Sequence, residues 1–157
     1  MNAADRILEH GRRKGATIAT AESCTAGMIA AALTDPPGSS AVFDRGFVTY
    51  SNAAKTQMLG VSPATLETFG AVSEEVAREM ADGARSRAGT TLAVAVTGIA
   101  GPGGSETKPE GRVCFAVSGP AETRSETREF GAIGRDGVRR ATVDHALELI
   151  LSHLAEC

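Results

Sequence analysis

The chain of 157 residues has the length of one compact domain, and its 42% apolar and 22% charged residues are typical of a globular protein with a buried core. A formal net charge of −3 and only 4% aromatic residues exclude the clustered basic face and the stacking platforms of nucleic-acid-binding proteins. No apolar run approaches the roughly 18 residues that a membrane helix needs, so we expect no membrane protein.

The first residues and the cysteines bear on compartment and metal binding. The segment from Met1 to Arg12 is polar and charged, unlike a signal peptide, so a cytoplasmic location is expected. The cysteines, Cys24, Cys114 and Cys157, form no CxxC pair and stand at no ligand spacing from a histidine. We therefore expect free thiols and no metal site.

Short apolar runs alternate with segments of helical period along the whole chain. In chain order, the pattern predicts a helix over Ala4–Lys14, a buried strand over Ala16–Ala21, a helix over Thr25–Leu33, a strand over Phe47–Tyr50, helices over Ala53–Leu59 and Pro63–Phe69, a longer helix opened by Ser73, a buried strand over Thr91–Val96, a hairpin of Val113–Val117 and Thr123–Glu129, and a last helix over Arg135–Leu154. Apolar strands between helices indicate an α/β protein with helices on both faces of the sheet, and the late hairpin indicates a mixed sheet.

Three loops carry the residues that chemistry would need, and the first is Thr20–Gly27, where a strand meets the start of a helix. Unpaired backbone N–H groups and the helix dipole favour an anion at such a place. Ser23 or Thr25 is equally well explained as the N-cap of that helix. Glu22 at the tip of a buried strand needs a partner or water.

The second loop, Val96–Ser105, is rich in glycine and follows the clearest buried strand. Ligands of open α/β sheets gather at the carboxyl ends of strands, and glycines let the backbone approach them closely. The spacing fits neither a Walker loop nor a dinucleotide fingerprint. Since the loop continues to about Gly111, it is either functional or simply flexible.

The third loop region extends from Gly38 to Lys55. It contains the serine hydroxyls of Ser39 and Ser40, the phenol of Tyr50 and the amine of Lys55. A desolvated, neutral Lys55 can act as the base that activates a serine, although a solvated surface lysine is the alternative, and Ser39 is also explained as a helix cap. If the chain from Ser40 to Tyr50 were extended, these two residues would lie ~30 Å apart at ~3.3 Å per residue. The catalytic interpretation therefore requires a reversal at Asp44-Arg45-Gly46.

Four long, ordered motifs make the sequence similar to a known family. The segments TAESCTAG, GSSAVFDRGFVTYSNAAKTQMLGV, FGAVSEEVAREMADGA and AVAVTGIAGPGG…KPEG resemble the CinA C-terminal domain family, over about Ala16 to Arg140. They are most similar to its stand-alone nicotinamide-nucleotide amidases. The resemblance implies a single domain over residues 1–157 with a three-layer α/β/α fold and a mixed, mostly parallel sheet. It also implies hydrolysis of nicotinamide mononucleotide to nicotinic acid mononucleotide and ammonia, without metal or cofactor, in a homodimer.

Carried over by motif, the resemblance implies a serine/lysine mechanism. Ser40 would be the nucleophile, Lys55 its base, and Tyr50 would position the groups or relay the proton. The implied substrate-binding residues are Ser23, Thr97, Gly98 and Arg135. The guanidinium of Arg135 would suit the substrate phosphate, and the Thr97-Gly98 turn would supply oxyanion donors. Because longer relatives carry an additional pyrophosphatase-like domain that is absent here, only the amidase activity is expected.

Alternatives remain for the nucleophile and for the class of function. Ser23 and Ser39 compete with Ser40, and Cys24 competes as a thiolate at a helix N-terminus. A non-catalytic nucleotide-binding or regulatory module would use the same loops, and a scaffold domain would use the glycine-rich loop alone.

The sequence also departs from the family pattern in two places. Ala26 stands where the family usually has Gly, which adds a Cβ near the expected pocket. The GPGGSETKPEG loop is one glycine short, and Glu110 and Arg112 replace small or apolar residues there. Both departures bear on the fit of the substrate rather than on the serine/lysine pair.

Overall fold

The structure, a computed structural model, describes all residues from 1 to 157. Its strands are β1 (Ile18–Glu22), β2 (Phe43–Val48), β3 (Leu92–Gly98), β4 (Arg112–Ser118) and β5 (Thr123–Glu129). Its helices are α1 (Ala3–Lys14), α2 (Met28–Thr34), α3 (Asn52–Leu59), α4 (Pro63–Phe69), α5 (Glu74–Ala88) and α6 (Arg135–Glu156), with a 3₁₀ turn η1 (Ser39–Ala41) before β2. No helix combines the length and apolar character needed to cross a membrane.

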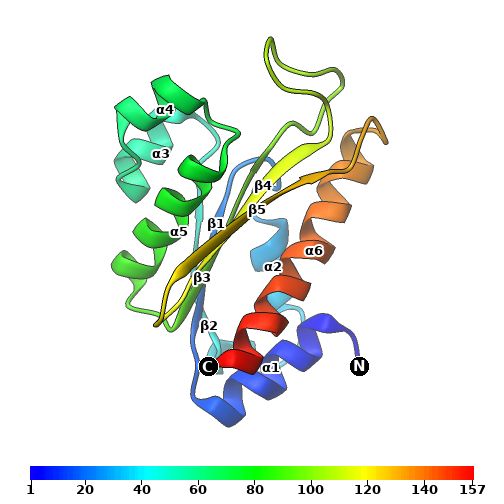
Figure 1. Cartoon of the computed structure of the whole chain (residues 1–157). Coiled ribbons are helices and arrows are strands. Elements are labelled where there is room, and N and C mark those ends of the chain that lie inside the picture. Colours follow the sequence, from blue (N-terminus) through cyan, green and yellow to red (C-terminus); the bar gives the residue numbers. More distant parts are fainter.

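The five strands form one sheet in the order β2-β1-β3-β4-β5 (Figure 1). Strand β1 pairs in parallel with both β2 and β3, whereas β4 pairs in an antiparallel manner with β3 and β5. Four strands therefore run in one direction and only β4 runs against them. The predicted hairpin and the mixed, mostly parallel sheet are confirmed.

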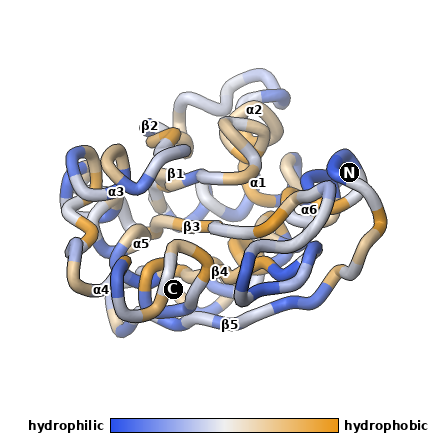
Figure 2. The backbone as a smooth tube through the Cα atoms, turned by 90° about the horizontal axis from the view of Figure 1, so that it is seen from above, coloured by the Kyte–Doolittle hydropathy of each residue, from blue (hydrophilic) through white to orange (hydrophobic).

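Helices cover both faces of the sheet, which confirms the expected three-layer α/β/α architecture (Figures 1 and 2). Side chains of β3 alternate between the two faces, as the period of two in a strand requires. Val94 and Val96 pack in the core formed with α1, α2 and α6, whereas Ala93 and Ala95 pack against α5. Each half of the core thus lies between the sheet and one helical layer.

On the α5 face, small residues let the helices come close to the sheet and to one another. A Cβ added at Gly83 of α5 would lie 2.0 Å from the carbonyl oxygen of Leu59, at the end of α3. The guanidinium of Arg87 donates to that same oxygen at 3.1 Å. Helix α3 is therefore held tightly against α5, and α3 carries Lys55.

Strand β2 begins four residues earlier than predicted. Asp44, Arg45 and Gly46, interpreted from the sequence as a turn, lie within the strand and are exposed. They are tolerated there because β2 is an edge strand, where charged side chains reach solvent and discourage edge-to-edge pairing. The chain therefore does not reverse between Ser39 and Phe47.

Helix α2 begins three residues later than predicted. Ala26 and Gly27 have φ values of 47° and 101°, in the left-handed region, so the backbone cannot enter the helix before Met28. The intervening residues, Ser23 to Gly27, form an irregular turn directly after β1.

Candidate active site

The carboxyl ends of β1, β2 and β3 lie side by side at one edge of the sheet. The segments that follow β1 and β3 lead to strands on opposite sides of this pair. The chain leaves β1 through α2 towards β2 on one side, whereas β3 continues to β4 on the other side. Ligands of α/β proteins bind at such a switch point. Ser23, Thr49 and the glycine-rich loop all follow these strand ends.

Lys55 lies on α3 with its ammonium group beneath this edge of the sheet, and its side chain is 1% exposed. The Nζ atom lies 3.0 Å from Ser23 Oγ, 3.0 Å from the carbonyl oxygen of Thr49 and 3.5 Å from that of Tyr50. No carboxylate forms an ion pair with it. The lysine is therefore buried among neutral partners.

This environment favours the neutral amine. Burial lowers the pKa of Lys55 below its usual value of 10.5, because the charged form loses hydration, and the nearby Cys24 opposes the shift only in part. A neutral amine has two N–H donors and one lone pair. The carbonyls of Thr49 and Tyr50 can take the two N–H bonds, which leaves the lone pair for the hydroxyl proton of Ser23.

Ser23 directly follows β1, and its side chain continues the face of Ala19 and Ala21 that α5 covers. Its N–H donates to the carbonyl of Val96 at 3.2 Å, which fixes the residue against β3. The next two backbone N–H groups, those of Cys24 and Thr25, donate to no acceptor within the protein. A hydroxyl and two free N–H groups are thus adjacent in the chain.

Glu22 is the partner of the α2 N-terminus. Its carboxylate accepts hydrogen bonds from the N–H groups of Ile29 and Ala30 at 2.9 and 3.0 Å, and from Thr25 Oγ1 at 2.5 Å. Neither Ser23 nor Thr25 caps the helix, which answers the question that the sequence left open. The anion expected at this helix N-terminus is therefore the protein's own carboxylate.

Ser40 lies at the opposite end of the sheet from Lys55. It belongs to η1, just before β2, and the carbonyl of Val42 accepts from the N–H of Ile18 at the start of β1. Strand β2 then runs for six residues, about 20 Å at ~3.3 Å per residue, before Thr49 is reached. The structure does not bring the expected Ser40–Lys55 pair together, because the reversal that it required is absent. Ser39 shares this location.

Tyr50 and Arg135 meet at the rim of the site. The Tyr50 ring is 59% exposed, and its hydroxyl accepts from Arg135 Nη2 at 2.9 Å. Arg135 also donates to the carbonyl of Gly101 at 2.8 Å, so it joins the glycine-rich loop to the β2–α3 loop. One turn further along α6, Arg139 Nε donates to the carbonyl of Cys24 at 3.1 Å. Only the backbone carbonyl of Tyr50, not its phenol, contacts Lys55.

Thr97 and Gly98 close β3 beside Ser23. The hydroxyl of Thr97 donates to the carbonyl of Ala71 at 2.8 Å, and the side chain is 1% exposed. A Cβ at Gly98 would lie 2.7 Å from Val113 Cγ2, so packing against β4 explains the glycine. Both residues border the site, but the Thr97 hydroxyl is already engaged by the protein.

Cys24 has the environment of a core residue. Its side chain is 5% exposed and packs in the core on the α6 side of the sheet. Burial raises the pKa of the Cys24 thiol to about 11, so the thiolate is scarce at neutral pH. This argues against Cys24 as the nucleophile.

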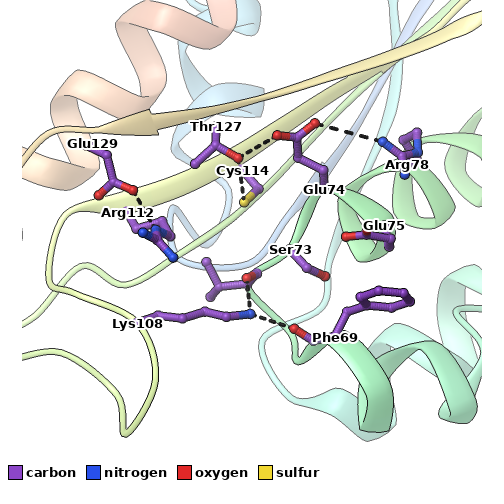
Figure 3. A pocket seen from close by; sticks show the side chains of 11 residues that line it. Phe69, Ser73, Glu74, Glu75, Arg78, Lys108, Arg112, Cys114, Thr127 and Glu129 are labelled. Carbon is purple, nitrogen blue, oxygen red and sulfur yellow. Dashed lines mark hydrogen bonds and ion pairs between the residues drawn. The ribbon is translucent and has the colours of Figure 1, made fainter.

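An open cavity of about 530 Å³ lies on the α5 face beside β4 and β5 (Figure 3). Its charged side chains largely bind other protein groups. Arg112 Nε lies 2.5 Å from Glu129, and the ammonium of Lys108 donates to the carbonyls of Phe69 and Val72. Lys108 thereby fastens the glycine-rich loop to the segment after α4.

This cavity is separated from the serine–lysine pair. Thr97 lies between Ser23 and Cys114 in a row of adjacent strand residues, and Cys114 lines the cavity. The segment around Ala71 covers Thr97 through its hydrogen bond. Neither Ser23 nor Lys55 therefore lines this cavity.

Sequence reasoning missed two groups that border the site. The carbonyl of Thr49 is a backbone group, whose contacts depend on the tertiary fold and leave no signal in the residue types. Arg139 was identifiable only by its position, one helical turn after Arg135, which places both guanidinium groups on one side of α6.

The left-handed backbone of Ala26 leads to a stability prediction. Replacing Ala26, φ 47°, by Gly removes the clash of its Cβ, at the cost of a more flexible unfolded chain. We expect Ala26→Gly to raise the free energy of unfolding by about 0.5–1 kcal/mol. Urea denaturation measures this difference, and Ala31→Gly, inside α2, is the matched control that should destabilise the protein. A lower stability of Ala26→Gly would contradict the argument.

Curated relatives of two lengths match the chain. It is 48% identical over 151 residues to the "Nicotinamide-nucleotide amidohydrolase PncC" of Escherichia coli K12, covering 96% of this chain and 92% of that protein. It is 50% identical over 151 residues to a "Putative competence-damage inducible protein" of Symbiobacterium thermophilum, covering 90% of this chain but 35% of that longer protein. The chain thus spans about a third of the length of the longer curated relatives.

Solved structures and a family model agree with these matches. The crystal structure of the competence/damage inducible protein CihA from Agrobacterium tumefaciens superposes with a TM-score of 0.93 at 51% identity, covering 96% of this chain and 92% of that one. A CinA superfamily protein from Klebsiella pneumoniae superposes with a TM-score of 0.94 at 34% identity over the full length of both chains. The model of the CinA C-terminal domain matches residues 1–154. The chain belongs to the CinA C-terminal domain family.

Proposed function

We propose that this protein hydrolyses the carboxamide of nicotinamide mononucleotide, with Ser23 as nucleophile and Lys55 as its general base. The observation that carries the mechanism is the 3.0 Å contact between Ser23 Oγ and the buried Nζ of Lys55. The E. coli relative, which matches nearly the full length of both chains, is named a nicotinamide-nucleotide amidohydrolase, and this supports the choice of substrate. Ser23 thereby takes the role that the motif comparison had suggested for Ser40.

The first half of the reaction forms an ester on Ser23. Neutral Lys55 accepts the hydroxyl proton as Oγ attacks the carboxamide carbon, and negative charge develops on the carbonyl oxygen. We assign that oxygen to the N–H groups of Cys24 and Thr25, which have no acceptor in the protein, because the residue after the nucleophile donates in this way in other serine hydrolases. The Lys55 ammonium then returns its proton to the leaving nitrogen, and ammonia departs.

The second half releases the acid. Lys55, neutral again, removes a proton from water, and the resulting hydroxide attacks the ester carbonyl carbon in the same oxyanion site. The bond between that carbon and Ser23 Oγ then breaks, and Lys55 returns the proton to the serine. The products are nicotinic acid mononucleotide and ammonia, and the enzyme is regenerated without metal or cofactor chemistry in any step.

The direct test is to incubate the purified protein with nicotinamide mononucleotide and to measure ammonia together with nicotinic acid mononucleotide. We expect equal amounts of the two products. Binding of the nucleotide without release of ammonia would instead support a non-catalytic nucleotide-binding module of the same fold. The homodimer and the cytoplasmic location that the sequence suggested stay predictions.

Arg135 is proposed to hold the substrate phosphate at the rim, since it is exposed and already bridges Tyr50 and the carbonyl of Gly101. Removing a charged hydrogen bond costs about 1.5–3 kcal/mol, so Arg135→Gln should raise KM for nicotinamide mononucleotide about 10- to 100-fold. Arg140→Gln is the matched control, because Arg140 pairs with Asp136 on an exposed helix face. Nicotinamide riboside, which lacks the phosphate, should be cleaved equally by wild type and Arg135→Gln; a loss with both substrates would contradict phosphate binding.

A further inference from the structure

The turn between β1 and α2 contains two sets of backbone N–H groups with different partners. Those of Ile29 and Ala30 donate to the Glu22 carboxylate, whereas those of Cys24 and Thr25 have no acceptor in the protein. The first set faces a carboxylate that the chain itself supplies. The second set follows Ser23 directly in the chain and has no partner in the protein.

Glu22 is an unusual group for this position. Its side chain is 1% exposed, and no lysine, arginine or histidine forms an ion pair with it. Its three hydrogen-bond donors all come from the turn and from the first turn of α2, where the helix dipole also favours a negative charge. Because all three bonds join Glu22 to residues 25–30, the carboxylate fixes the conformation of that segment.

The hydroxyl of Thr25 links the two sets of N–H groups. Thr25 Oγ1 donates to Glu22 Oε1 at 2.5 Å, and its side chain is fully buried. The N–H of the same residue is one of the two free donors beside Ser23. The bond from its side chain to Glu22 therefore restrains the direction of a donor that the proposed reaction uses.

We propose that Glu22 and Thr25 are positioning residues of the amidase reaction, which hold the oxyanion donors of Cys24 and Thr25 next to Ser23. This inference rests on the proposed function. Glu22 also accepts from the N–H groups of Ile29 and Ala30, so those two donors are not free for a substrate.

The test compares Thr25→Val, Thr25→Ser and Glu22→Gln in ammonia release from nicotinamide mononucleotide. Loss of one oxyanion donor reduces kcat about 10²–10³-fold in enzymes of this kind, so a misdirected donor should cost about tenfold or more, with KM within about twofold. Thr25→Ser keeps the hydroxyl and should recover most of the kcat lost in Thr25→Val. Thr34→Val is the control, because this exposed hydroxyl bonds only to carbonyls of its own helix.

The outcomes separate the inference from the function on which it rests. If the wild type releases no ammonia, the proposed function fails. If the wild type is active and folded Thr25→Val has the kcat of Thr34→Val, the inference alone is overturned, and the same follows if only KM changes. Glu22→Gln places an amide N–H against backbone donors, so this variant can fail to fold. Thr25→Val is nearly isosteric and decides the outcome by itself.

Discussion

Ser23→Ala is expected to reduce kcat/KM for ammonia release from nicotinamide mononucleotide by about a thousandfold or more while the protein remains folded. The substitution removes the only hydroxyl within hydrogen-bond distance of Lys55 Nζ. Replacing the nucleophile of a serine hydrolase removes most of its rate enhancement, and the remainder comes from binding and the oxyanion donors. KM should change little, since the hydroxyl contributes mainly to the transition state.

Ser40→Ala is the matched control for this prediction. Ser40 belongs to the 3₁₀ turn at the opposite end of β2, is exposed and contacts neither Lys55 nor the free N–H groups. It should therefore retain the activity of the wild type. An inactive Ser40→Ala together with an active Ser23→Ala would restore the assignment that the motifs alone suggested and would reject the present one.

Lys55→Met is expected to have an equally large effect on the rate, because it removes the base and keeps the length and apolar stem of the side chain. Rates of the wild type should rise with pH as Lys55 loses its proton. The rise should level off below pH 10.5, because burial lowers the pKa of Lys55. The residual rate of Lys55→Met should not show this rise with pH. A wild-type profile without the rise, or a variant that retains it, would contradict Lys55 as the base.

The same pKa shift has a consequence for stability. Between the folded-state pKa of Lys55 and 10.5, the unfolded chain binds more protons than the folded one, so the free energy of unfolding rises with pH in that window. Below the window the full cost of burying the charge remains. Lys55→Met removes this dependence, and denaturant unfolding at a series of pH values should show the wild type gaining stability relative to the variant as the pH rises.

Much of the fold was predictable because the core strands are nearly continuous apolar runs. Positions 92–96 and 113–117 are buried on both faces, so their composition alone indicates strands covered by helices. The predicted bounds of α4 and β5 agree with the structure, since Pro63 and Gly70 limit the first and the hairpin turn limits the second. The predicted start of α2 was wrong because Ala26 and Gly27 have left-handed backbone. The predicted start of β2 was wrong because an edge strand tolerates charged residues that usually indicate a turn.

The partner of Lys55 was less predictable, because it depends on whether the chain turns before β2 or continues as a strand. The charged residues Asp44 and Arg45 indicated a turn, and that turn would have brought Ser40 near Lys55. Because β2 is an edge strand, it accommodates them in extended conformation and carries Ser40 away. Ser23 and Lys55 are 32 positions apart and meet only because β1 and β2 are parallel neighbours whose carboxyl ends coincide. No local pattern encodes that pairing.

The protonation state of Lys55 tests the central claim most directly. The chain contains only three lysines, Lys14, Lys55 and Lys108, so the ¹³Cε resonances of a lysine-labelled sample can be followed individually through a pH titration. The signal absent from Lys55→Met identifies Lys55. The account predicts that this signal titrates clearly below pH 10.5 in the folded protein. A midpoint at or above 10.5 would mean that the amine beside Ser23 stays charged, and would contradict its role as the base.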